Sequence, residues 1–236
     1  MIKAVFFDLD GTLLPMDLDV FTKEYLSTLC RRMTRYGYEP KELANTIWQG
    51  TRLMYKNDGK RTNEEVFWDY FRQVYGERAT EDKDRFEEYY RTDFPKVRNV
   101  CGFNESAGRV VKEIANMGFV TVLATNPIFP SVATEIRAGW TGVDIKDFRY
   151  YTTYENSHYT KPNLNYYSEI LERLNLSAEE VVMIGNDTLD DMIAERLGMK
   201  VFLVTDDLIN KSGEDISKYP HGNLEDSLEY VKSLIK

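Results

Sequence analysis

Two aspartates stand two residues apart at the end of the first hydrophobic run of the sequence. Asp8 and Asp10 lie in the stretch FFDLDGTLLP, residues 6–15, and Gly11 and Thr12 follow them directly. Residues i and i+2 of a strand point to the same side, so both carboxylates can address one ligand from the end of the strand. Open α/β sheets bind their ligands at that end. The spacing therefore predicts a functional site.

This doublet needs positive charge beside it, because two neighbouring carboxylates repel each other. A hard cation with oxygen ligands, Mg²⁺ above all, relieves the repulsion. Gly11 lets the chain turn sharply and Thr12 adds a hydroxyl. The alternative is a plain turn, since Asp-Gly is a strong hairpin signal. That alternative weakens as the rest of the chain supplies partners, and the doublet is interpreted as half of a metal site.

Two polar positions downstream could hold a phosphate. Thr125 and Asn126 follow the apolar run FVTVLAT, where we expect a helix to begin and its free N–H groups to seat an anion. Lys161 stands in YTKPN, just before a helix that Pro162 is expected to open. Taken singly, Thr-Asn-Pro is a cap or turn, and a lone loop lysine is a solvated side chain.

A third strand end is rich in acids. The run EVVMIGN leads into Asp187, Asp190 and Asp191, with Gly185 and Asn186 just before them. Acidic helix caps explain two of these aspartates but hardly all three. At least one carboxylate here is therefore a candidate for the same site as the doublet.

The elements that position these groups follow from hydrophobic patterning. Four apolar runs rich in β-branched and aromatic residues alternate with helical patterns, and they cover residues 2–7, 119–125, 180–186 and 200–206. Continuous apolar runs are typical of strands buried on both faces. Their alternation with helices predicts an α/β fold: a Rossmann-like parallel sheet with right-handed crossovers.

The stretch from about residue 18 to 95 has no such run, and its apolar spacing predicts four helices over 19–33, 41–55, 63–76 and 82–94. Punctuation residues support these borders: Asn63 and Asp82 as N-caps or near-caps, Gly37 and Gly76 at C-termini, and Pro40 as an opening residue. We expect an all-helical cap domain, residues 15–101, inserted into an α/β core of residues 1–14 and 102–236. The two linkers are expected to act as hinges crossed by few contacts.

Composition excludes several function classes. The 236 residues carry 30 Lys and Arg against 39 Asp and Glu, a formal charge of −9, which argues against a nucleic-acid partner. The densest basic run, residues 31–37, is interpreted as a solvated helix face. Cys30 and Cys101 have no metal-ligand spacing and suggest a reducing, cytoplasmic location. No apolar stretch approaches bilayer length, so no membrane role is expected. A monomer or homodimer is anticipated.

These motifs together resemble the haloacid dehalogenase-like (HAD) hydrolase superfamily. The resemblance covers residues 1–14 and 102–236, and its four motifs occur in order at the ends of predicted strands. DLDGT matches the first motif at every place, Thr125 the second, Lys161 the third and GNDTLDD the fourth. The helical insert is similar in position to the cap of one subgroup of this superfamily.

The resemblance implies roles for individual residues. Asp8 is the nucleophile that forms an aspartyl-phosphate, and Asp10 is the general acid and base. Thr125 and Lys161 complete the catalytic set, and Gly11, Thr12, Asn126, Thr125 and Lys161 contact the phosphate. Mg²⁺ is held by Asp8, by the backbone carbonyl of Asp10 and by Asp187. The fourth motif departs from the commonest spelling, because Asn186 follows Gly185, so a metal role for Asn186, Asp190 or Asp191 stays open.

The resemblance also implies a reaction class. The dehalogenases of the superfamily lack an acid at the position of Asp10, whereas its phosphatases have one. The prediction is a Mg²⁺-dependent phosphatase that acts on a small phosphorylated metabolite. Two alternatives remain: a sugar-phosphate mutase of the same superfamily, and a non-catalytic binding protein that retains the fold.

Overall fold

The computed structural model describes residues 1–235 and contains one six-stranded sheet in which every strand pair is parallel. The strand order is β3-β2-β1-β4-β5-β6, which places the strand of the aspartate doublet at the centre. The strands are β1 (Ala4–Phe7), β2 (Val120–Leu123), β3 (Tyr150–Tyr151), β4 (Val181–Gly185), β5 (Lys200–Val204) and β6 (His221–Gly222). The predicted parallel α/β sheet is confirmed, and the two short edge strands β3 and β6 are additions to it.

Alternate residues of β1 face opposite sides of the sheet, and both sides are covered. Ala4 and Phe6 belong to a buried cluster that includes side chains of α8 (Leu164–Leu174), whereas Val5 and Phe7 belong to a second cluster with α6 (Ser106–Asn116) and α9 (Leu224–Ser233). All four strand residues are fully buried. This burial on two faces explains why the strand reads as a continuous apolar run.

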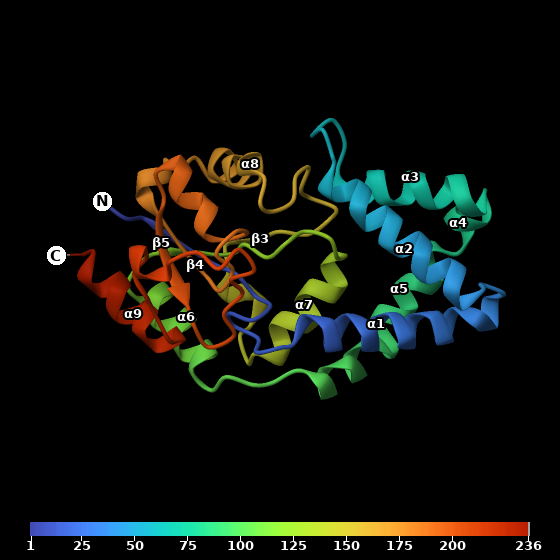
Figure 1. Ribbon diagram of the computed structural model, residues 1–236, viewed down its shortest axis with the longest axis horizontal. Helices are drawn as coiled ribbons and strands as arrows, with labels where there is room; N and C mark the ends of the chain where they lie inside the picture. Colours follow the sequence, from blue (N-terminus) through green and yellow to red (C-terminus); the bar gives the residue numbers. More distant parts are fainter. Residues whose placement is uncertain (236) are drawn as a thin grey trace.

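The helices from α1 to α5, which follow β1 in the chain, form the part of Figure 1 that lies opposite the two termini. Its four long helices agree with the four predicted from the sequence, and a single short helix, α4, is added between two of them. In chain order they are α1 (Leu18–Met33), α2 (Pro40–Tyr55), α3 (Asn63–Tyr75), α4 (Arg78–Glu81) and α5 (Lys83–Thr92), followed by a 3₁₀ helix, η2 (Phe94–Val100). α7 (Ser131–Trp140) follows β2 and packs against this helical part.

The predicted borders of these helices are mostly correct, with one change. Pro40 is the first residue of α2 and Gly76 caps the end of α3, as expected. The N-cap of α3 is Thr62, which shares a capping box with Glu65, so Asn63 lies one residue inside the helix. The Asn63 side chain is buried instead and donates to the carbonyl of Pro127, 3.1 Å away in the core.

The two connections between insert and core run side by side. Met16 and Cys101 form an antiparallel bridge, and the N–H of Gly102 donates to the carbonyl of Pro15 at 2.7 Å. These contacts lie next to the predicted domain boundaries after residues 14 and 101, which remain a prediction.

The expectation that few contacts cross this boundary is wrong. Phe129, in the core loop after β2, packs against Phe21, Tyr25 and Phe94 of the insert, with ring centroids 5.2 to 6.4 Å apart. One hydrophobic cluster therefore runs through both parts. The aromatic residues that patterned the helices also bind them to the core. Within residues 1–235, no helix combines the length and the apolar character that crossing a membrane requires.

Candidate active site

The carboxyl ends of the three central strands meet around one hollow of about 330 Å³. Asp8 and Asp10 line it from the end of β1, Thr125 from the end of β2 and Asp187 from the end of β4. These strands are hydrogen-bonded neighbours, with Phe7 in register with both Leu123 and Ile184. Groups more than a hundred residues apart in sequence are thereby brought together, as the pattern of strand ends predicted.

Lys161 reaches this hollow from the loop before α8 and is only 1% exposed. Its ammonium group donates to Asp8 at 2.7 Å and to Asp191 at 2.5 Å. Burial lowers the pKa of Lys161, but Asp191 and Asp8 together outweigh burial and raise it well above the ordinary lysine value. The group is therefore a fixed cation that orients the Asp8 carboxylate. Asn163, not Pro162, caps α8, which begins at Leu164.

The Asn186 side chain stabilises the turn after β1. Its carboxamide oxygen accepts from the hydroxyl of Thr12 at 3.0 Å, and its nitrogen donates to the carbonyl of Asp207 at 2.6 Å. Gly11 has a φ of +84°, and a Cβ there would stand 2.2 Å from the Asn186 nitrogen. Because both ends of its amide are engaged in the fold, Asn186 is a structural link between the two motifs.

The carboxylates of Asp191 and Asp187 have different hydrogen-bond partners. The Asp191 carboxylate is buried between Lys161 and the backbone N–H of Asp187. One oxygen of Asp187 accepts from the backbone N–H groups of Leu189 and Asp190, at 2.7 and 3.0 Å. Its other oxygen accepts no hydrogen bond from the part of the chain that the structure describes, so it is available to a ligand.

The donor set fits a hard divalent cation. One carboxylate oxygen of Asp8 accepts a hydrogen bond from Lys161. Among the described residues, the other oxygen accepts only a weak hydrogen bond from the hydroxyl of Thr12, at 3.4 Å. Six carboxylates line the hollow against two lysines, and these are Asp8, Asp10, Asp19, Asp187, Asp190, Asp191, Lys161 and Lys211. Such an excess of negative charge favours Mg²⁺ on oxygen ligands.

Side chains alone do not complete a metal shell. Among residues 1–235, no three His, Cys, Asp or Glu side chains form a group that could hold a metal ion. The predicted ligands are two carboxylates, those of Asp8 and Asp187, with a backbone carbonyl of Asp10. This ligand set remains a prediction.

The loop after β2 differs from the sequence prediction. α7 begins at Ser131, six residues beyond Thr125, and the N–H of Ser131 is taken by the carboxylate of Glu155. The helix N-terminus therefore offers no phosphate seat at Thr125. Thr125 and Asn126 still line the hollow, and the Asn126 amide donates to the hydroxyl of Tyr55, on the insert, at 3.1 Å.

Arg137 was not among the residues predicted from the sequence. This side chain of α7 is fully buried and forms an ion pair with Asp10. Two of its nitrogens and one Asp10 oxygen have no hydrogen-bond partner among the described residues. Its guanidinium group lies 4.5 Å from the ring centre of Phe129. Burial raises the pKa of Asp10 above its usual value, and Arg137 opposes that shift.

Replacing Arg137 should destabilise the fold by leaving the Asp10 carboxylate without its partner. We expect Arg137→Met to lower the free energy of unfolding by about 3 kcal/mol, the low end for breaking a buried ion pair, because Asp10 keeps some contact with the hollow. Urea denaturation measures this loss. In an Asp10→Asn background the same change should cost much less. An equal loss of unfolding free energy in both backgrounds would show that the ion pair between Arg137 and Asp10 contributes nothing to stability.

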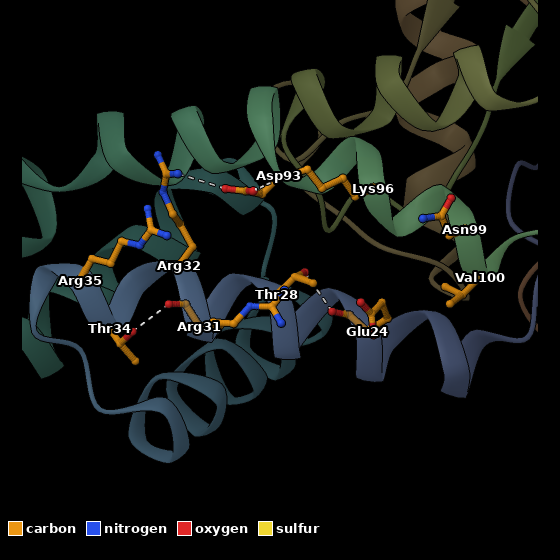
Figure 2. Close-up of a pocket in the computed structure, with 10 residues that line it drawn as sticks. All are labelled: Glu24, Thr28, Arg31, Arg32, Thr34, Arg35, Asp93, Lys96, Asn99 and Val100. Carbon is orange, nitrogen blue, oxygen red and sulfur yellow. Dashed lines mark hydrogen bonds and ion pairs between the residues drawn. The ribbon is translucent and has the colours of Figure 1, made fainter.

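A larger hollow, about 410 Å³, lies on the insert between α1 and η2 (Figure 2). Its basic side chains come from the run at residues 31–37 and from Lys96, but Arg32 and Lys96 both bind Asp93, at 3.1 and 2.7 Å. None of the residues predicted to act in catalysis, phosphate binding or metal binding lines this hollow. The structure thus keeps this basic run apart from the candidate active site.

Comparisons with known proteins agree with this geometry. No curated protein shows significant similarity to this chain. Among solved structures, the chain is similar to a 2-haloacid dehalogenase from Pseudomonas syringae pv. tomato, with 19% identity, a TM-score of 0.65 and coverage of 99% and 100% of the two chains. It is also similar to a predicted phosphoglycolate phosphatase from Haemophilus somnus, with 14% identity, a TM-score of 0.57 and coverage of 98% of both chains. A third similar structure is a HAD phosphatase from Thermococcus onnurineus, with 17% identity, a TM-score of 0.56 and coverage of 99% of this chain and 98% of the other.

Those likenesses show the shared fold, including the helical insertion after the first strand. The family model described as haloacid dehalogenase-like hydrolase matches residues 2–198, most of the chain. That span contains the aspartate doublet, Thr125, Lys161 and the acid-rich turn after β4. The chain belongs to the haloacid dehalogenase-like hydrolase family.

Proposed function

We propose that this hydrolase is a Mg²⁺-dependent phosphatase that releases phosphate from a small phosphorylated metabolite through an aspartyl-phosphate on Asp8. The observation that carries the proposal is the pair of carboxylates lining one hollow: Asp8, oriented by Lys161, and Asp10, two residues further on. A nucleophile and a separate proton donor at one site are what phosphoester cleavage requires.

In the first step, an oxygen of Asp8 attacks phosphorus and the bond from phosphorus to the leaving oxygen breaks. The electron pair stays on that oxygen, which takes a proton from Asp10. The raised pKa of Asp10 favours the protonated carboxyl that this transfer needs. Lys161 keeps the attacking carboxylate in place and offsets the negative charge of the entering phosphate.

In the second step, Asp10 removes a proton from water, whose oxygen attacks the phosphorus of the aspartyl-phosphate. The bond between Asp8 and phosphorus breaks, and the carboxylate and free phosphate are restored. When bound by Asp8, the Asp10 carbonyl and Asp187, Mg²⁺ supplies positive charge against the phosphate oxygens. Thr125 and Asn126 line the same hollow and would add polar side-chain contacts to the phosphate.

Dehalogenation is the other chemistry named among the structural relatives, and Asp10 argues against it. A halide leaves without a proton, whereas an alkoxide leaves readily only when it is protonated. Arg137 holds the Asp10 carboxyl group in place near Asp8, and an acid–base group at this position has a use in phosphoester cleavage and none in halide release.

The experiment is a screen of phosphorylated metabolites with phosphate release as the readout, in Mg²⁺ and in EDTA. We expect release from at least one sugar, nucleoside or aryl monophosphate, and its loss in EDTA. Turnover of a sugar phosphate without free phosphate would identify the mutase instead. Binding of phosphate esters without any turnover would identify a non-catalytic protein, and halide release from 2-chloropropionate would identify a dehalogenase.

A matched control separates the two hollows. Arg31→Ala changes the basic hollow between α1 and η2, and Arg31 does not line the candidate active site. We expect phosphate release by this variant to stay within about twofold of the parent, since surface substitutions away from a site have small effects. A large loss would move the search for the phosphate site to the insert.

A further inference from the structure

We propose that the leaving group accepted at this site is a flat, uncharged ring, aromatic or heteroaromatic, so that the substrates are phosphomonoesters of ring-bearing alcohols. The inference rests on the proposed phosphatase function and concerns the part of the hollow that the insert and the neighbouring core loop line. That part is built by α1 and α2 of the insert and by the core loop at Ile128 and Phe129.

The α2 contribution is a single aromatic face. Trp48, Thr51 and Tyr55 stand at i, i+3 and i+7, which places them on one side of the helix, and all three line the hollow. Trp48 is 48% exposed and Tyr55 is 45% exposed. Large rings left open toward one cavity, instead of scattered over the surface, mark a binding surface for apolar groups.

Apolar groups continue this face on both flanks. Leu18, 39% exposed, and Phe21 line the hollow from α1, and Ile128 and Phe129 line it from the core loop. A leaving group attached to a phosphate on Lys161 would extend into this space. The volume of about 330 Å³ is at the small end for ligand pockets and suits a phosphate carrying one or two rings.

The charges that line the hollow argue against a second anionic group on the substrate. None of the described insert residues that line it is basic, and the one charged residue among them is Asp19. The two lining cations belong to the core: Lys161 binds Asp8 and Asp191, and Lys211 lies near Asp190. A carboxylate held beside Trp48 and Tyr55 would lose its water, and the described insert residues that line this part of the hollow offer it no cation, which is unfavourable.

Four alcohol phosphates test the substrate class, because each leaving group is an alkoxide that needs a proton from Asp10. They are benzyl phosphate, n-propyl phosphate, glycerol 3-phosphate and 2-phosphoglycolate, whose leaving group carries a carboxylate. With the Mg²⁺-loaded protein, we expect kcat/KM to be at least about tenfold higher for benzyl phosphate than for each of the others, as ring stacking predicts.

Variants on α2 localise the effect. Trp48→Ala should lower kcat/KM for benzyl phosphate about tenfold more than for acetyl phosphate, which has no ring. Trp48→Phe should retain most of the preference. Leu53→Ala is the matched control, because Leu53 is 38% exposed on the same helix but does not line the hollow, and it should change neither substrate.

Binding is measured separately by tryptophan fluorescence. Trp48 is the exposed member of three tryptophans, since Trp140 is buried and Trp68 is partly buried and donates to Tyr154. Phenylphosphonate, which has no ester bond to cleave, should quench this fluorescence in the parent and not in Trp48→Phe. Methylphosphonate should leave it unchanged in both.

The results distinguish the two levels of the argument. If acetyl phosphate is hydrolysed but 2-phosphoglycolate or n-propyl phosphate equals benzyl phosphate, the phosphatase stands and the inferred substrate class is wrong. If none of the compounds releases phosphate, the proposed phosphatase function is wrong. Quenching by phenylphosphonate then still shows whether Trp48 contacts a ring. Absence of quenching overturns the ring site whatever the turnover.

Discussion

Asp8→Asn is expected to abolish turnover, with kcat reduced by at least about 10⁴-fold, because loss of an essential nucleophile leaves only the catalysis due to positioning and charge. The amide is nearly isosteric with the carboxylate but does not attack phosphorus. Lys161 keeps its second partner, Asp191, so the fold should survive. Steady-state phosphate release measures the loss, and circular dichroism with urea denaturation checks the fold.

The same chemical change elsewhere is the control. Asp58→Asn alters an exposed aspartate of the insert that pairs with Lys60, and it should leave turnover unchanged. Acid-quenched wild-type protein should also carry a phosphate adduct on the peptide that contains Asp8. Activity of Asp8→Asn within about tenfold of the parent, or an adduct on another residue, would remove Asp8 from the nucleophile's role.

The central sheet could be predicted because its residues obey two rules at once. The four long strands are largely buried on both faces, so their side chains are apolar except for Thr121 and Lys200, and polar groups follow at the carboxyl ends. The edge strands β3 and β6 do not show this pattern. Each pairs over two residues only, and their side chains are partly exposed, so neither has an apolar run to announce it.

The start of α7 was misplaced although a signal was present. Pro127 and Pro130 each disfavour helical backbone in the residue before them, so the helix begins only after the second proline, at Ser131. The expectation of a helix directly after the apolar run overlooks the effect of the second proline. The phosphate seat that was predicted there depended on this error, whereas the position of Thr125 at the strand end did not.

Arg137 was missed because an arginine in a helix ordinarily reads as a solvated residue. Its helical neighbours on the same face are Ala133, Thr134 and Trp140, all buried. A charged residue on that face requires a buried partner, and several acids of the sequence, Asp10 among them, could have been that partner. The partner could have been sought on these grounds, but its identity depends on where α7 packs, which patterning does not give.

Asp10→Asn should affect the two halves of the reaction according to the leaving group. With an alkyl phosphate, we expect the first step to slow by about 10²- to 10⁴-fold, because the alkoxide then departs without a proton. With acetyl phosphate, acetate departs unaided, so the variant should still form the aspartyl-phosphate on Asp8. Hydrolysis of that intermediate should be slow, since the water also loses its base.

Single-turnover measurements read the two steps separately. Acetyl phosphate should give a burst of acetate equal to the protein present, followed by slow phosphate release, and benzyl phosphate should give no burst of benzyl alcohol. Asn at position 10 leaves Arg137 buried without its carboxylate, so the double variant with Arg137→Met serves as the control for folding. Equal slowing of the first step for both donors would mean that Asp10 only shapes the site. Unchanged rates with alkyl phosphates would return the choice between phosphate and halide chemistry to the remaining residues of the hollow.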